Sequence, residues 1–119
     1  QTPTIVLKGG RVALVTGSPG GRTIPNTTLW VVLNTLEFGL SPQAAVDAPR
    51  THHQWFPDRL VIERSFPDET VIDALRARGH RVARSSAQGN ANSITVDPQT
   101  GLIHGIADRR RSTAHASGD

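Results

Sequence analysis

A glycine-rich connection at residues 17–21, Gly-Ser-Pro-Gly-Gly, constrains this chain more than any other feature because it joins two strongly apolar segments. The segment before it, residues 12–15, is continuously apolar, which predicts a strand covered on both faces. The helix expected after it, over residues 25–38, is apolar on more than one side, as in helices buried between layers. Its main expected core stripe consists of Leu29, Val32, Leu33 and Leu36. Together these patterns predict a layered fold.

Turn residues divide the rest of the chain into short elements. Strands are expected at residues 4–8 and 11–16, joined by a tight turn at Gly9-Gly10. The further expected elements are a helix over 42–48, a loop over 50–59, a strand at 60–63, a helix capped by Ser65 or Asp68 and stopped by Gly79, an extended piece from Val82, and a hairpin with its turn at 97–101. The pattern predicts an α/β (α+β) protein with mostly antiparallel sheets.

Composition limits what this fold can be. A length of 119 residues allows one domain, and only 36 % of the residues are hydrophobic, with three Phe and two Trp. A domain so poor in large side chains is expected to need further protein layers around it. The absence of Cys excludes disulfides, thiolate metal sites and a cysteine nucleophile. No segment approaches the roughly 20 apolar residues of a membrane span.

The charge pattern does not favour a nucleic-acid partner. The net charge is +3, and the only basic run is residues 109–111. A nucleic-acid interface requires a basic face with interleaved aromatics or a known motif, and neither is visible. Residues 109–119 are polar and are expected to form a frayed tail.

The connection at 17–21 is the strongest candidate for chemistry. Glycines bring bare N–H groups close to a ligand, and donors near a helix start suit an anion. The pattern is not a phosphate-binding P-loop, which ends in Gly-Lys-Ser/Thr, and it is not a G-x-S-x-G nucleophile elbow. A tight strand-to-helix connection explains the spacing equally well, so both interpretations stay open at this point.

A second cluster, His52-His53-Gln54-Trp55-Phe56, is interpreted as structural. Adjacent residues on a strand point to opposite faces, so His52 and His53 do not converge on one metal ion. No further ligand lies at a useful spacing, and no metal or cofactor is expected. Trp55 and Phe56 are expected to anchor a packed loop.

Five segments in order along the chain resemble the γ-glutamyltranspeptidase family. These are T-P-T-I-V at 2–6, V-T-G-S-P-G-G at 15–21, A-A-V-D-A-P-R-x-H-H-Q-W-x-P-D at 44–58, A-R-G-H-R-V at 77–82 and G-x-A-D-x-R at 105–110. Two departures are Arg22, at a position often small and polar, and Arg109 within an Asp-Pro-Arg motif of the family.

The resemblance implies part of the four-layer αββα sandwich of N-terminal-nucleophile hydrolases. It also implies a self-cleaving precursor and a γ-glutamyl-enzyme whose acyl group passes to water, an amino acid or a peptide. Gly20 and Gly21 would supply the N–H groups of the oxyanion hole, while Ser18 and Pro19 would shape the substrate-binding loop. Residues 1–119 would be a single partial domain, the C-terminal portion of the small subunit.

By the same resemblance, the nucleophilic threonine lies upstream of Gln1, and neither Thr2 nor Thr4 takes its place. The chain alone is therefore expected to be inactive. The expected partners are a small γ-glutamyl substrate, the large subunit and the upstream part of the small subunit. The implied location is periplasmic, secreted or at the cell surface. The alternative is a stand-alone, non-catalytic domain that binds a small anion or a protein.

Overall fold

The computed structural model describes residues 3–118, which divide into two compact units. Unit 1 contains the described residues up to Ala48 and those from Gly89 onward, and unit 2 is Pro49–Gln88. The expectation that residues 1–119 form a single partial domain stays a prediction beside this division into two units.

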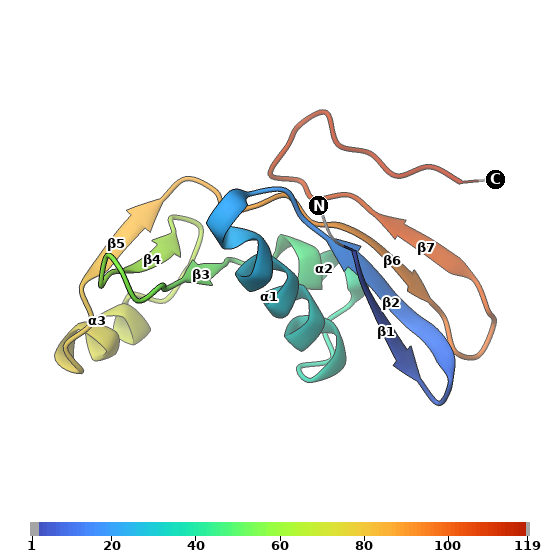
Figure 1. Ribbon diagram of the computed structural model, residues 1–119, viewed down its shortest axis with the longest axis horizontal. Helices are drawn as coiled ribbons and strands as arrows, with labels where there is room; N and C mark the ends of the chain where they lie inside the picture. Colours follow the sequence, from blue (N-terminus) through green and yellow to red (C-terminus); the bar gives the residue numbers. More distant parts are fainter. Residues whose placement is uncertain (1–2, 119) are drawn as a thin grey trace. The chain divides into compact units, whose positions relative to one another are not determined.

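Unit 1 is built on a four-stranded antiparallel sheet in the order β1-β2-β6-β7 (Figure 1). The strands are β1 (Thr4–Lys8), β2 (Arg11–Gly17), β6 (Asn92–Val96) and β7 (Ile103–Ile106). The expected hairpin between β1 and β2 is confirmed, with φ values of 59° and 77° at Gly9 and Gly10. The central pair β2–β6 joins segments far apart in the sequence. The sheet therefore forms only when the N-terminal and C-terminal segments of unit 1 come together.

Helices α1 (Ile24–Leu36) and α2 (Pro42–Asp47) lie on one face of this sheet (Figure 1). The side chain of Asn34 fastens them together, because its Nδ2 donates to the carbonyl of Ala45 at 3.1 Å. The buried apolar core beneath the helices consists of Leu14, Val31, Val46, Ala91 and Ile106.

The expected core stripe of α1 is wrong. The helix buries Thr27, Val31 and Asn34, whereas Leu29 and Leu36 keep 51 % and 44 % of their surface exposed. The buried positions do follow helical spacing, but two of the three are polar, so a search for apolar residues overlooks them. Their polar groups fit because α1 packs against a hydrogen-bonded loop and α2 as well as against apolar residues.

The sheet of unit 1 has a second face that no helix of the unit covers. Ile5 pairs with Val15 and Val15 with Ile94, so these side chains form one row across β1, β2 and β6 on that face. Ile5 and Ile94 are 61 % and 42 % exposed. The sequence predicts that the strand at residues 12–15 is covered on both faces, whereas among the described residues Leu14 is buried and Val12 is 41 % exposed.

Unit 2 combines a short antiparallel strand pair with a parallel crossover. Its elements are β3 (Thr51–His52), β4 (Leu60–Glu63), α3 (Glu69–Ala77) and β5 (Val82–Ser85), and the sheet order is β3-β4-β5. β4 and β5 run parallel with α3 between them along the chain, an exception to the mostly antiparallel pattern. Of the two expected caps, the structure uses Asp68, whose carboxylate accepts the N–H groups of Thr70 and Val71.

Candidate functional site

The glycine-rich connection begins at the end of β2 and runs into a 3-10 turn, Gly21–Thr23, that leads directly into α1. Gly20 and Gly21 have φ values of 143° and 56°. Side-chain-bearing residues rarely adopt such angles, and a Cβ on Gly20 would lie only 2.6 Å from Thr23 Oγ1. The backbone conformation therefore requires glycine at position 20 and favours it at position 21, where a Cβ would meet no atom within 4 Å.

Three internal hydrogen bonds, to two carbonyls, orient the peptide groups of this loop. The hydroxyl of Ser18 donates to the carbonyl of Pro19 at 2.6 Å, and Thr23 donates to the carbonyl of Gly20 from its N–H and its hydroxyl, at 3.2 and 3.0 Å. In a trans peptide the N–H points opposite to the C=O. Because both carbonyls face these donors, the N–H groups of Gly20 and Gly21 point the opposite way, and both residues are exposed.

Three further features make the loop attractive to an anion. Gly20 and Gly21 are exposed, and no group within residues 3–118 accepts a hydrogen bond from either N–H. The loop also lies at the N-terminal end of the 13-residue helix α1, where the helix dipole is positive. Arg22 is exposed within the same turn and adds a full positive charge.

The interior side of the loop rests on residues 89–91. Ser18 is fully buried, and its Oγ accepts the N–H of Asn90 at 2.9 Å. Gly89 is packed so closely that a Cβ there would lie 2.4 Å from Thr27 Oγ1 and 2.8 Å from Ser18 Oγ. Both bonds of the Ser18 hydroxyl are thus internal, which agrees with a role in shaping the loop and leaves no part of that hydroxyl facing outward.

The chain from Ala107 to Arg110 is fastened to the same region. Asp108 is fully buried and accepts the N–H of Ala91 at 2.8 Å, and Arg110 donates to the carbonyls of Val46 and Ala48 at 2.9 and 2.8 Å. The expected frayed tail therefore begins with anchored residues. Fraying beyond these bonds stays a prediction.

The histidine cluster lies in unit 2. His52 is buried and its Nε2 lies 2.9 Å from Gln54 Oε1, whereas His53 is exposed with its Nε2 3.1 Å from Asp58 Oδ1. The two rings have different partners, and only His52 lies within β3. Across the described residues, no three His, Cys, Asp or Glu side chains are grouped as a metal site.

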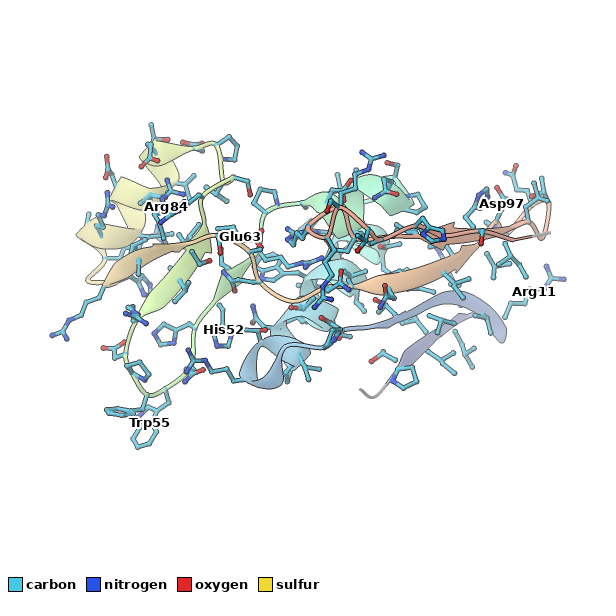
Figure 2. The ribbon with its side chains drawn as sticks, turned by 90° about the horizontal axis from the view of Figure 1, so that it is seen from above. Arg11, His52, Trp55, Glu63, Arg84 and Asp97 are labelled. Carbon is cyan, nitrogen blue, oxygen red and sulfur yellow. The ribbon has the colours of Figure 1, made fainter. Side chains whose placement is uncertain are left out.

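The expected anchoring role of Trp55 and Phe56 is wrong within the described chain. Trp55 is 91 % exposed and Phe56 is 77 % exposed, and Trp55 projects from the tip of its loop (Figure 2). The polar residues of the loop bond to each other instead, since Gln54 Nε2 donates to the carbonyl of Phe56 at 2.7 Å. This turn directs the rings outward.

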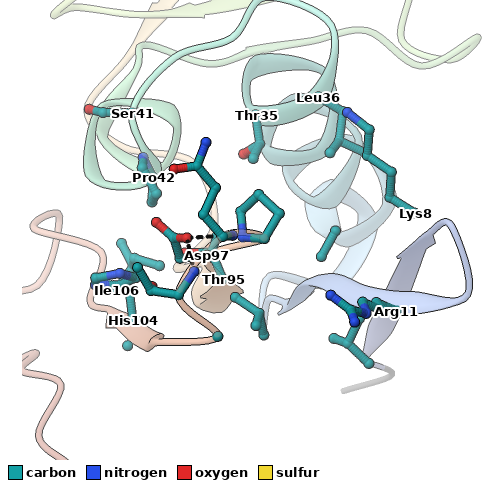
Figure 3. A pocket seen from close by; sticks show the side chains of 18 of the residues that line it. Lys8, Arg11, Thr35, Leu36, Ser41, Pro42, Thr95, Asp97, His104 and Ile106 are labelled. Carbon is teal, nitrogen blue, oxygen red and sulfur yellow. Dashed lines mark hydrogen bonds between the residues drawn. The ribbon is translucent and has the colours of Figure 1, made fainter.

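A large hollow of about 1180 Å³ lies at the other end of unit 1, between the sheet and the ends of α1 and α2 (Figure 3). Its rim carries Lys8, Arg11 and His104, and its wall includes the buried Thr95. The nearby carboxylate of Asp97 is already engaged, because the N–H groups of Thr100 and Gln99 hold its pKa below the usual value. The hollow lies at the opposite end of β6 from the glycine loop.

A family model described as gamma-glutamyltranspeptidase matches residues 1–118. The chain belongs to the γ-glutamyltranspeptidase family. It is similar to the glutathione hydrolase proenzyme of Escherichia coli (strain K12), with 46 % identity over 110 residues that cover 92 % of this chain and 19 % of that protein. The corresponding proenzyme of Bacillus subtilis (strain 168) is 35 % identical over 115 residues, which cover 96 % of this chain and 19 % of that protein.

Solved structures agree with this assignment. A mutant γ-glutamyltranspeptidase of Helicobacter pylori superposes with a TM-score of 0.88 at 40 % identity, covering 92 % of this chain and 60 % of that chain. A cephalosporin acylase of Bacillus halodurans gives 0.85 at 31 % identity, covering 98 % and 22 %. The predicted fold class, part of an αββα sandwich of the N-terminal-nucleophile hydrolase type, is confirmed. The chain spans about a fifth of the length of the curated relatives named above.

For this γ-glutamyltranspeptidase segment, the sequence identified the loop but missed what lies behind it. Asn90, Gly89 and Asp108 contact or support the loop, yet each looks like an ordinary turn residue in the sequence. The G-x-A-D-x-R segment at 105–110 is the one sequence signal that could have pointed to Asp108. This segment is part of the family resemblance, but the resemblance assigns it no role. In the part of the chain that the structure describes, no helix is long and apolar enough to cross a bilayer.

Proposed function

We propose that this chain supplies the oxyanion-binding loop of a γ-glutamyltransferase or γ-glutamyl hydrolase. The reaction would cleave the γ-glutamyl amide bond of a glutathione-like substrate through a γ-glutamyl-enzyme, and then pass the acyl group to water, an amino acid or a peptide. The observation that carries the proposal is the pair of outward N–H groups at Gly20 and Gly21, on adjacent peptides at a helix start.

The chemistry follows from where charge develops. Attack on the γ-carbonyl carbon converts its oxygen into an anion, and two N–H donors fixed beforehand stabilise this anion without rearrangement. Hydrolysis or transfer of the acyl-enzyme places charge on the same oxygen again, so the N–H groups of Gly20 and Gly21 would act in both halves of the reaction. Removing one such donor typically lowers kcat by about 10²–10³-fold.

The remaining groups would come from outside this chain. The nucleophile would be an N-terminal threonine that uses its own α-amine as base, supplied by the upstream part of the small subunit. The large subunit would complete the site for the small γ-glutamyl substrate, and no cofactor is required by this chemistry. A periplasmic, secreted or cell-surface location remains part of the proposal by family resemblance.

Replacing Gly21 by two different residues in the complete enzyme tests the proposal. Gly21→Pro removes the N–H, whereas Gly21→Ala keeps it and places its Cβ where no atom lies within 4 Å. We expect kcat for release of the chromophore from a γ-glutamyl anilide to fall by at least about 10²-fold for Gly21→Pro and far less for Gly21→Ala. Equal kcat in the two variants, with both folded, would contradict the oxyanion role and favour a non-catalytic anion-binding loop.

A related acylase activity is the second candidate. The acylase ACY 1 proenzyme of Pseudomonas sp. (strain SE83) is 37 % identical over 109 residues, which cover 90 % of this chain and 19 % of that protein. The same two N–H groups would serve any amide whose cleavage passes through a tetrahedral oxyanion. Turnover of an N-acyl cephalosporin but not of a γ-glutamyl anilide by the complete enzyme would establish this candidate instead.

A further inference from the structure

We infer that Asp108 is a positioning residue for the oxyanion loop, acting through residues 89–91 and the hydroxyl of Ser18. This inference rests on the proposed function of Gly20 and Gly21. Asp108 is distant from the loop in sequence, and its carboxylate accepts hydrogen bonds from Ala91 and Arg110. Its influence passes through three consecutive hydrogen bonds, each of which fixes the next peptide group.

The first link joins Asp108 to the backbone behind the loop. Its Oδ2 accepts the N–H of Ala91 at 2.8 Å, and its Oδ1 accepts the N–H and guanidinium of Arg110 at 3.0 and 3.2 Å. Arg110 in turn donates to the last carbonyls around α2, those of Val46 and Ala48. The carboxylate therefore connects residue 91 to the helix layer, and its buried charge is balanced by Arg110.

The second link passes from the backbone to Ser18. The peptide next to Ala91 is that of Asn90, whose N–H donates to Ser18 Oγ at 2.9 Å. Gly89 leaves no free space at this contact, since a Cβ there would overlap Thr27 and Ser18. A shift of residues 89–91 would therefore move the Ser18 hydroxyl or break its bond.

The third link sets the direction of a proposed catalytic N–H. Once its oxygen accepts from Asn90, the Ser18 hydroxyl directs its proton to the carbonyl of Pro19 at 2.6 Å. That carbonyl belongs to the same planar peptide as the N–H of Gly20. Holding the Pro19 oxygen inward holds the Gly20 N–H outward, toward the place where the oxyanion would form.

The test compares three single variants in the complete enzyme. Asp108→Asn keeps the side-chain shape but turns one acceptor into a donor, facing either Ala91 or Arg110. Ser18→Ala breaks this series of three hydrogen bonds, the relay, at the end near the loop and does not alter a buried charge. Asp97→Asn is the matched control, because its carboxylate also accepts two backbone N–H groups, those of Gln99 and Thr100, in the turn at the far end of β6.

We expect Asp108→Asn and Ser18→Ala each to lower kcat for a γ-glutamyl anilide by at least about tenfold, with KM changed less than about twofold, because a misdirected donor weakens only transition-state binding. The double variant should lose about as much as the more impaired single variant, since both act through one relay. Amide hydrogen exchange in the peptide covering residues 17–23 should become faster in both variants and stay unchanged in Asp97→Asn.

Unchanged amide exchange at residues 17–23 in folded Asp108→Asn would overturn the relay. A loss of kcat/KM that comes mainly from a higher KM would also overturn it. So would a double variant in which the kcat losses of the two single variants are fully additive. If Asp108→Asn fails to fold, Ser18→Ala decides by the same measurements. Exchange does not depend on catalysis, so the two proposals can fail separately. Faster exchange with kcat unaffected by Gly21→Pro would retain the relay and reject the oxyanion role.

Discussion

The carboxylate of Glu63 accepts the N–H of Gln88 at 2.6 Å, and its other oxygen accepts the N–H of Arg50 at 2.9 Å. These partners lie at opposite ends of unit 2, so one side chain at the end of β4 ties the beginning of the unit to its end. Arg50 completes the arrangement, because its Nη1 donates to the carbonyl of Gln88 at 2.7 Å. Glu63, labelled in Figure 2, is fully buried.

Neutralising this carboxylate should destabilise unit 2. In Glu63→Gln an amide NH2 faces one of the two backbone donors, and hydrogen bonds to a charged group contribute about 1.5–3 kcal/mol each. We expect the free energy of unfolding, measured by urea denaturation, to fall by about 2–3 kcal/mol. The control is Glu69→Gln, which removes a solvent-exposed partner of Arg84 and should change the unfolding free energy by less than about 1 kcal/mol.

Gly89 should tolerate no side chain. Gly89→Ala would place a Cβ 2.4 Å from Thr27 Oγ1, in addition to the strain at a φ of 68°. Gly101→Ala is a matched control, because its φ is 75° and no atom lies within 4 Å of the added Cβ. We expect Gly89→Ala to lower the unfolding free energy by about 1–3 kcal/mol more than Gly101→Ala, as overpacking does. Equal losses would mean that the packing behind the loop is loose.

Asp68 should make the stability of α3 depend on pH in the acid range. Bonds from the Thr70 hydroxyl and the Val71 N–H hold the pKa of Asp68 below its usual value of 3.8. A lowered folded-state pKa gives stability that is complete above the unfolded-state pKa and is lost as pH falls through the folded-state pKa. The Tm of Asp68→Asn, which keeps a capping oxygen, should therefore fall less than the wild-type Tm below about pH 4. Parallel Tm curves would contradict this assignment.

The bare face of the unit 1 sheet should bind apolar dyes when residues 1–119 are isolated. Ile5, Val15 and Ile94 form an adjacent row there, and monomeric proteins rarely expose large contiguous apolar patches. The double variant Ile5→Thr/Ile94→Thr should reduce dye fluorescence clearly, whereas Val71→Thr on α3 should not, although Val71 is also exposed. A monodisperse wild-type chain with a sharp thermal transition and no dye binding would contradict this expectation.

Local patterns predicted the element order and the loop because the relevant signals lie between neighbouring residues. Glycines with positive φ mark the β1–β2 turn and the ends of α1 and α3, at Gly9-Gly10, Gly39 and Gly79. Most expected strands and helices accordingly lie within two residues of their observed bounds. The buried face of α1 was missed because Thr27 and Asn34 are polar, and their burial depends on partners from elsewhere in the chain.

The sequence by itself determined that a Gly-Ser-Pro-Gly-Gly loop follows an apolar strand and begins a helix, and that the chain resembles the γ-glutamyltranspeptidase family. Only the tertiary structure decided which way the loop's peptide groups face. That direction depends on bonds from Ser18 to Pro19 and from Asn90 to Ser18, and the second of these joins residues 72 positions apart. Spacing along a chain reveals φ requirements and periodicity, whereas the orientation of an N–H is set by acceptors and donors that only folding brings together.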